Sequence, residues 1–132
     1  RCWVSLRRFP PIFGEHRLSD INTLAPGRPM ILLIENQVYL AQGNYAKVIG
    51  RSDGQLSVCE GMHYGLVALH IRIQTAAAFE AMGKWQEAEQ MLTQAILEAE
   101  TDYLVLPFVE NYCYLKNFWC AVRNRKACLS GI

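Results

Sequence analysis

The chain has 132 residues, of which 52% are hydrophobic and 19% are charged, and its formal net charge is +1. A domain of this length can bury a core without metal ions or disulfides. The near-neutral charge gives no signature of nucleic-acid or anionic-membrane binding, and the longest strongly apolar run, Met30 to Ile34, is too short to span a bilayer. We therefore expect one domain that contacts neither nucleic acid nor membrane directly.

Residues 1–28 contain most of the prolines and are expected to be an irregular lead-in or the remnant of a preceding helix. Within them, the range from Glu15 to Leu24 predicts a short helix, because Leu18, Ile21 and Leu24 can share one face. The chain begins with Arg1 rather than Met, so we expect a fragment of a longer protein; no secretory leader is visible.

Residues 29–61 indicate a first pair of helices. Apolar residues recur at spacings of three and four from Met30 to Gln42, after a proline suited to a first helical turn and before Gly43, which suits the left-handed position that ends a helix. Tyr45 to Cys59 predicts the second helix. Its two glycines, Gly50 and Gly54, either admit a neighbouring helix closely or mark a break near Ser52-Asp53.

Residues 62–101 predict a second pair, with helices over His63–Met82 and Trp85–Glu100. The latter has the clearest apolar stripe of the chain, opposite a polar face that reads as solvated. Residues 102–132 predict terminal helices, with Asp102 as an N-cap and Pro107 either in a first turn or at a kink. The whole range 1–132 is thus expected to form one all-α domain.

The two pairs repeat each other. Tyr39–Tyr45 matches Phe79–Trp85 at an offset of 40 residues, and each unit has an aromatic residue, three further residues, Gly, one residue and then a second aromatic residue. A tight turn between antiparallel helices favours Gly, and the small Ala88 allows the helices to lie close together. Fixed-period similarity of this kind is typical of helical-repeat proteins.

The second unit resembles the tetratricopeptide repeat at Phe79, Gly83, Trp85, Ala88, Leu92, Ala95 and Ile96. It departs from that pattern at Arg72, where Trp is common, at Ala76, where Gly is common, and in lacking a closing Pro; the offset of 40 also exceeds the usual 34. The resemblance implies a right-handed superhelix of antiparallel helix pairs, a tetratricopeptide-like α-solenoid fragment.

A narrower resemblance is carried by Ala95–Glu100 and Phe108-Val109-Glu110. Over about residues 30–115 the chain resembles the helical-repeat region of large LuxR-family bacterial transcription regulators of the MalT type. The resemblance implies a cytoplasmic segment that binds an effector or a partner and controls an ATPase and a helix-turn-helix domain elsewhere in the protein. Neither a P-loop nor a recognition-helix module is present in these residues. The alternative is a free-standing scaffold for protein–protein interaction.

The tetratricopeptide resemblance also implies a concave groove lined by the first helix of each pair. Its inward positions would include Leu33, Leu40, Ile73 and Ala77. The polar residues expected there, to hold a small-molecule effector or a protein or peptide partner, are Gln37, His70, Glu80, Asn111 and Tyr114.

The residues give little support for metal binding, catalysis or disulfide formation. Cys59, Glu60, His63 and His70 cluster around one helix start, but a closed zinc site needs four well-placed ligands, and packing is the simpler interpretation. No catalytic arrangement stands out, so we expect no enzyme, no metal and no cofactor. The five cysteines lack a Cys-x-x-Cys motif and are expected to be reduced and mostly buried.

Dense aromatic residues near the C-terminus allow two interpretations. They are either a core between the last repeat and the terminal helix or an exposed anchor surface, and both stay open. The group comprises Tyr103, Phe108, Tyr112, Tyr114, Phe118 and Trp119.

Overall fold

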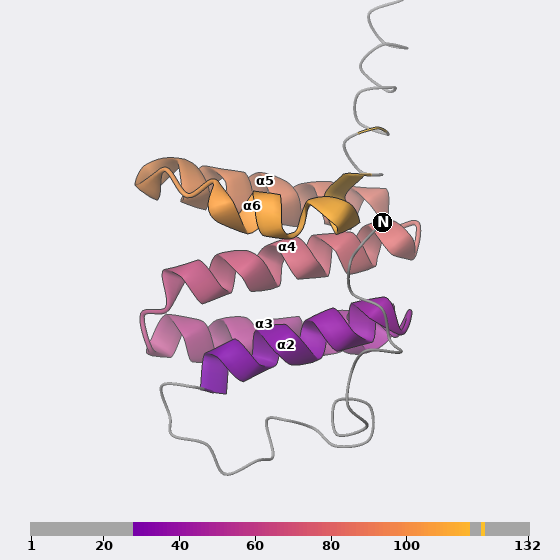
Figure 1. Ribbon diagram of the computed structural model, residues 1–132, viewed down its shortest axis with the longest axis horizontal. Coiled ribbons are helices and arrows are strands. Elements are labelled where there is room, and N and C mark those ends of the chain that lie inside the picture. The colour runs from indigo at the N-terminus through magenta and orange to yellow at the C-terminus, as the bar shows by residue number, and fades with distance from the viewer. Residues whose placement is uncertain (1–27, 117–119, 121–132) are drawn as a thin grey trace, which may run out of the picture.

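The computed structural model describes residues 28–116 and residue 120, and these are all-helical, without a strand among them (Figure 1). The fold class is therefore confirmed at the level of an all-α protein. The helices are α2 (Arg28–Ala41), α3 (Tyr45–Gly61), α4 (Gly65–Ala81), α5 (Trp85–Asp102) and the short α6 (Leu106–Glu110). A further helical turn follows at 112–116. The expected helix from Glu15 to Leu24 lies outside the described residues.

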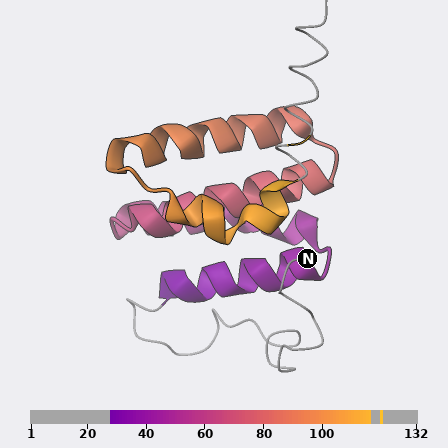
Figure 2. The same ribbon diagram turned by 45° about the horizontal axis from the view of Figure 1, so that its top comes forward.

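Successive helices run antiparallel, and α4 lies in the middle of the described bundle (Figures 1 and 2). It packs against α3 and α5 most extensively and also contacts α2 and α6. In Figure 1, α2 and α6 lie nearer the viewer, in front of α3 and α5. We call the side of α4 that α2 and α6 flank the α2/α4/α6 face.

The core follows from the apolar stripes of these helices. Ala88, Ala95 and Ala99 of α5 are buried beside Leu92, and their short side chains bring α5 close to α4. Leu115 from the turn after α6 completes this cluster against Leu69, Ile73 and Ala76. A second cluster joins α2, α3 and α4, and it contains Leu33, Leu56, Cys59, Val67, Ala68 and Ile71.

Several buried contacts between helices are polar. Asn36 of α2 and Gln55 of α3 exchange two hydrogen bonds of 2.8 and 3.2 Å. Arg51, one turn before Gln55 in α3, also forms an ion pair with Glu35 of α2. Because buried amides cost free energy unless they are hydrogen-bonded, this pairing fixes the register of α2 against α3. The hydrophobic pattern alone does not predict this pairing.

Each helix from α2 to α5 is followed by a residue with left-handed backbone. These residues are Gly43 (φ 75°), His63 (φ 56°), Gly83 (φ 76°) and Tyr103 (φ 54°), at intervals of 20 residues. In each turn the next amide donates to a carbonyl five residues back, for example Asn44 to Tyr39 and Tyr64 to Cys59. This bond is the mark of a Schellman helix end. The predicted glycine turns are therefore confirmed, and the turn repeats every 20 residues rather than every 40.

Within α3, neither expectation for the paired glycines holds. The helix is unbroken at Ser52-Asp53, and both Gly50 and Gly54 are exposed with open space where a side chain would stand. Among the described residues, no neighbouring helix therefore approaches them. In the terminal region Pro107 lies in the first turn of α6, as one alternative predicted, whereas Asp102 is the last residue of α5 and not an N-cap.

The expectation of reduced thiols holds for some cysteines only. Cys59 is buried and free, and Cys120 is exposed and free. Cys113 is disulfide-bonded, so the expectation is wrong at this position. Spacing along the chain could not reveal this, because bond formation depends on which residues meet in three dimensions.

No described helix combines the length and the apolar character that crossing a membrane requires. The division of the chain into the parts 1–28, 29–61, 62–101 and 102–132 stays a prediction.

Candidate functional site

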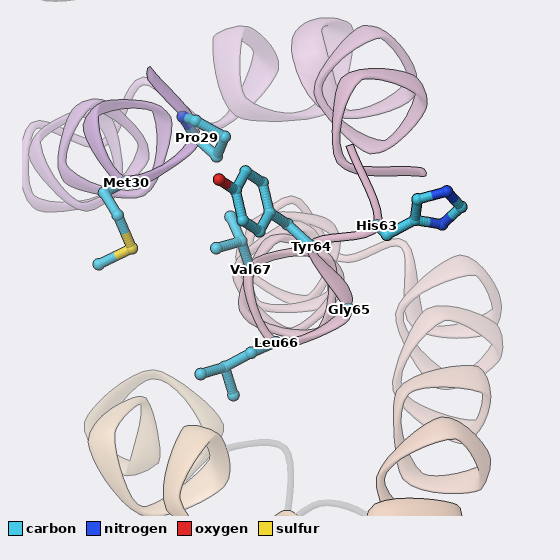
Figure 3. A pocket seen from close by; sticks show the side chains of 7 residues that line it. All are labelled: Pro29, Met30, His63, Tyr64, Gly65, Leu66 and Val67. Atoms are coloured by element: carbon cyan, nitrogen blue, oxygen red, sulfur yellow. The ribbon is translucent and has the colours of Figure 1, made fainter. Parts of the chain in front are cut away.

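The α2/α4/α6 face is hollowed where α2 and α4 begin. A cavity of about 260 Å³ lies between these helix starts and is lined by Pro29, Met30, His63, Tyr64, Gly65, Leu66 and Val67. Figure 3, which looks along α4, shows the side chains of Met30 and Leu66 directed to the same open side, whereas His63 points the other way. The floor of the cavity is formed by the aromatic ring of Tyr64 and by Val67 (Figure 3).

This end of the face presents apolar side chains to solvent. Met30 is 54% exposed, Leu66 is 51% exposed, and Ile34, one turn after Met30, is 38% exposed. A cluster of large exposed apolar residues beside a cavity is typical of a surface that another molecule or segment covers. We call Met30, Ile34 and Leu66 the apolar mouth.

The middle of the face holds a polar network between α4 and α6. The Asn111 amide nitrogen donates 2.8 Å to the Pro107 carbonyl and lies 3.0 Å from His70 Nδ1. The opposite ring nitrogen of His70 lies 3.3 Å from Glu110 Oε2. Since the amide can only donate, Nδ1 accepts and Nε2 bears the proton that points at Glu110. Burial lowers the pKa of His70, against the opposing effect of Glu110, so this imidazole is held neutral.

The far end of the face is filled by the chain itself. Tyr114 packs against the cluster of Leu40, Val48 and Ala78, and its hydroxyl is buried without a hydrogen-bond partner among the described residues. Burial, and secondarily Tyr45, raises the pKa of Tyr114. This residue therefore closes the face rather than lining an open groove.

The five predicted site residues are thus only partly brought together. His70 and Asn111 touch, but Asn111 is buried and oriented toward α4 and the backbone of α6. Gln37 on α2 and Glu80 on α4 are half-buried and lie outside this network, and burial raises the pKa of Glu80. The other positions expected to face inward, Leu33, Leu40, Ile73 and Ala77, are buried in the core.

Sequence reasoning missed the apolar mouth and Glu110. Met30 and Leu66 each stand in the first turn of a helix, just after Pro29 and Gly65. Only packing shows that nothing described covers them.

A second cleft opens between α3, α4 and α5, where metal binding was considered. It has a volume of about 410 Å³, and its deepest charged group is Arg72, which donates 3.0 Å to Glu98 and lies 3.9 Å from Glu60. Burial, and secondarily Glu60, raises the pKa of Cys59, which keeps it a thiol. Among the described residues no three potential metal ligands come together. Arg72 thus ties three helices together at the position where the tetratricopeptide pattern favours Trp.

The aromatic residues near the C-terminus divide between the two interpretations. Phe108 packs against the core, whereas Tyr103 is 90% exposed and Tyr112 is also exposed. Phe118 and Trp119 lie outside the described residues. A cavity of about 350 Å³ at the α5–α6 junction is lined in part by the exposed Tyr103 and Val105. Leu106, Val109 and Tyr112, in α6 and just after it, also expose their apolar side chains. We call these five residues the α5–α6 patch.

Comparison with known proteins finds no family model, no curated protein and no solved structure that matches this chain.

Proposed function

We propose that this chain is the effector- or partner-binding segment of a LuxR-type transcriptional regulator. In this proposal the helix pairs continue as a right-handed superhelix, and the cytoplasmic protein has an ATPase domain and a helix-turn-helix domain elsewhere. Binding on the α2/α4/α6 face controls those domains. The segment itself neither catalyses a reaction nor binds DNA. The regulator part of the proposal is supported by the sequence resemblance over about residues 30–115.

The observation that supports binding at this face is the apolar mouth beside a cavity and a polar network. Met30 and Leu66 offer apolar contact, while the exposed carboxylate of Glu110, toward which the Nε2 proton of His70 points, offers a hydrogen-bond acceptor. A mostly apolar hollow with a few convergent polar groups is the usual form of a small-ligand or peptide site. Gln37 lies further along α2, and Glu80 lies near the end of α4.

The coding sequence on both sides of this segment tests the regulator. An upstream Walker-type ATPase and a downstream helix-turn-helix would support it, and their absence would contradict it. In the intact regulator, Leu66→Ser should weaken effector-dependent transcription of a reporter gene. Leu97→Ser, which replaces an exposed leucine on α5, is the matched control and should leave transcription unchanged.

The α5–α6 patch favours a second candidate function, a scaffold for protein–protein interaction. Its five large apolar side chains are more exposed than a monomeric surface usually tolerates in one place. A gene that lacks both flanking domains, together with loss of a partner on Val109→Asp, would support the scaffold over the regulator.

A further inference from the structure

The cavity at the α5–α6 junction shares no lining residue with the cavity beside the apolar mouth. It lies where the chain turns back from α5 into α6, at the left-hand end of the bundle in Figure 1. We propose that this junction binds a cationic amphipathic peptide of a partner protein. An apolar side chain of the peptide enters the cavity, and its neighbouring Lys or Arg side chains lie against the carboxylates at the end of α5.

The cavity is apolar and has room for a large side chain. Its volume of about 350 Å³ is near the lower end of the range for ligand sites, which is roughly 300–1,000 Å³. Ile96, Leu104 and Phe108 line it and also pack against the main core cluster, so the core holds these walls in place. Tyr103 and Val105 line it as well and are exposed. An apolar side chain can therefore be buried here without rearrangement of the core.

The exposed apolar surface continues beyond the cavity along α6. The Val109 amide donates 3.3 Å to the carbonyl of Val105, so the two side chains lie one helical turn apart on the same side of the helix. Tyr112 is exposed three residues later. A surface of this length leaves several apolar side chains to cover, and a peptide covers them better than one small molecule does.

The charge of α5 selects a cationic occupant. Trp85–Asp102 contains five Asp or Glu residues and no Lys or Arg. Glu100 lines the cavity and Asp102 ends the helix, and neither forms an ion pair with another described residue. The helix dipole adds partial negative charge at the same end. The site therefore attracts Lys or Arg and repels an acidic peptide or a nucleic acid.

Tyr103 stands between the apolar and the acidic parts of this site. Its left-handed backbone, with a φ of 54°, follows the last residue of α5, and its ring is exposed to solvent. The face of a tyrosine ring accepts apolar groups and also attracts a Lys or Arg cation. Tyrosine is among the residues that contribute most to the binding energy of interfaces. Tyr103 is therefore the anchor of the site.

This inference rests on the surface that the scaffold candidate uses, and it adds the chemistry of the partner. Its test needs only the chain and synthetic peptides, so it is independent of binding at the α2/α4/α6 face. If a partner were lost on Val109→Asp while no cationic peptide bound the chain, the scaffold would stand and this inference would be overturned.

Fluorescence anisotropy of a labelled synthetic peptide measures binding to the full 132-residue chain. The probe is an amphipathic peptide built from Leu and Lys. Two matched peptides carry Glu in place of every Lys, or Ser in place of every Leu. The wild type should bind the first peptide at least about tenfold more tightly than either of the others, because the site requires both positive charge and apolar side chains.

Two pairs of variants place the peptide at the junction. Glu100→Lys should weaken binding about fivefold, whereas Glu89→Lys, the same charge change at an exposed position of the same helix, should stay within about twofold of the wild type. A Lys in the last turn is favoured by the helix dipole, so Glu100→Lys keeps the fold. Tyr103→Ala should weaken binding at least about tenfold. Leu97→Ala removes an exposed side chain outside the cavity and should have no effect.

Several outcomes would overturn the proposal. They are equal binding of the Lys and Glu peptides, binding that survives both Glu100→Lys and Tyr103→Ala, and no binding by the wild type, as when other residues of the chain already cover the patch. Sedimentation velocity without peptide tests a second copy as the occupant: wild-type dimers that Tyr103→Ala converts to monomers would also overturn it. An unchanged far-ultraviolet circular dichroism spectrum shows that a variant loses binding without unfolding.

Discussion

At the residue scale, two of the four turn positions hold residues that disfavour left-handed backbone. Gly43 and Gly83 adopt positive φ without a steric cost, whereas His63 and Tyr103 bring a Cβ into that region. The Schellman bonds are nevertheless present in all four turns. The packing of the helices therefore imposes the turn geometry even where the local sequence opposes it. The result is backbone strain at His63 and Tyr103.

Tyr103→Gly should raise the free energy of unfolding by about 0.5–1 kcal/mol, because relief of the left-handed strain exceeds the backbone entropy that Gly adds to the unfolded chain. The side chain is 90% exposed, so its loss removes little packing. Urea denaturation of the full chain measures the change. Tyr103→Ala retains Cβ and should stay near the wild type; a destabilised Tyr103→Gly would contradict the explanation.

His70 predicts a specific pH dependence. Its pKa in the folded state is lowered by burial below the unfolded value near 6.5, so the unfolded chain binds more protons in the window just below that value. The free energy of unfolding that this residue contributes is therefore present above pH 6.5 and declines as the pH falls through the window.

Urea titrations between pH 5 and 8 should show this decline in the wild type and a smaller one in His70→Gln. His63→Gln, which alters an exposed histidine, is the control and should retain the wild-type slope. Equal slopes in all three proteins would show that His70 remains solvated.

At the element scale, α3 contains two glycines that its surroundings do not require. A Cβ at Gly50 or Gly54 would meet no atom within 4 Å, and both residues are exposed in mid-helix. Gly50→Ala and Gly54→Ala should each raise the free energy of unfolding by about 0.5–1 kcal/mol, since Ala loses less entropy in a helix.

Chemical denaturation compares these variants with Gly43→Ala, which should lower stability because Gly43 has a φ of 75°. A loss of stability in Gly54→Ala would instead indicate that something packs against this side of α3.

At the scale of the whole molecule, the turn after α6 completes the core of the second helix pair. Leu115 is buried against α4 and α5, far along the chain from the residues it touches. Leu115→Ala should therefore lower the free energy of unfolding by roughly 2–4 kcal/mol. Thermal or urea unfolding measures this, and Leu97→Ala, exposed on α5, should change stability by less than about 0.5 kcal/mol. Similarly small effects of Leu115→Ala and Leu97→Ala would mean that residues 112–116 do not pack against α4 and α5.

The sequence by itself determined the helices and two of their turns. Apolar spacing of three and four residues reflects the helical period, and glycine at 43 and 83 marks helix ends through local backbone sterics. These signals lie within a few residues of one another, so no knowledge of distant contacts was needed. The same local logic gave a first turn as one of the two places open to Pro107, and α6 begins there.

Tertiary structure alone decided which polar groups are buried and which apolar ones stay exposed. Asn111 and Tyr114 were expected in an open groove, but the docking of 106–116 beside α4 buries Asn111 and the hydroxyl of Tyr114. Met30 and Leu66 look like core residues in the sequence, yet the described helices leave them uncovered. Burial depends on which helices meet across long separations, and the period of one helix does not contain that information.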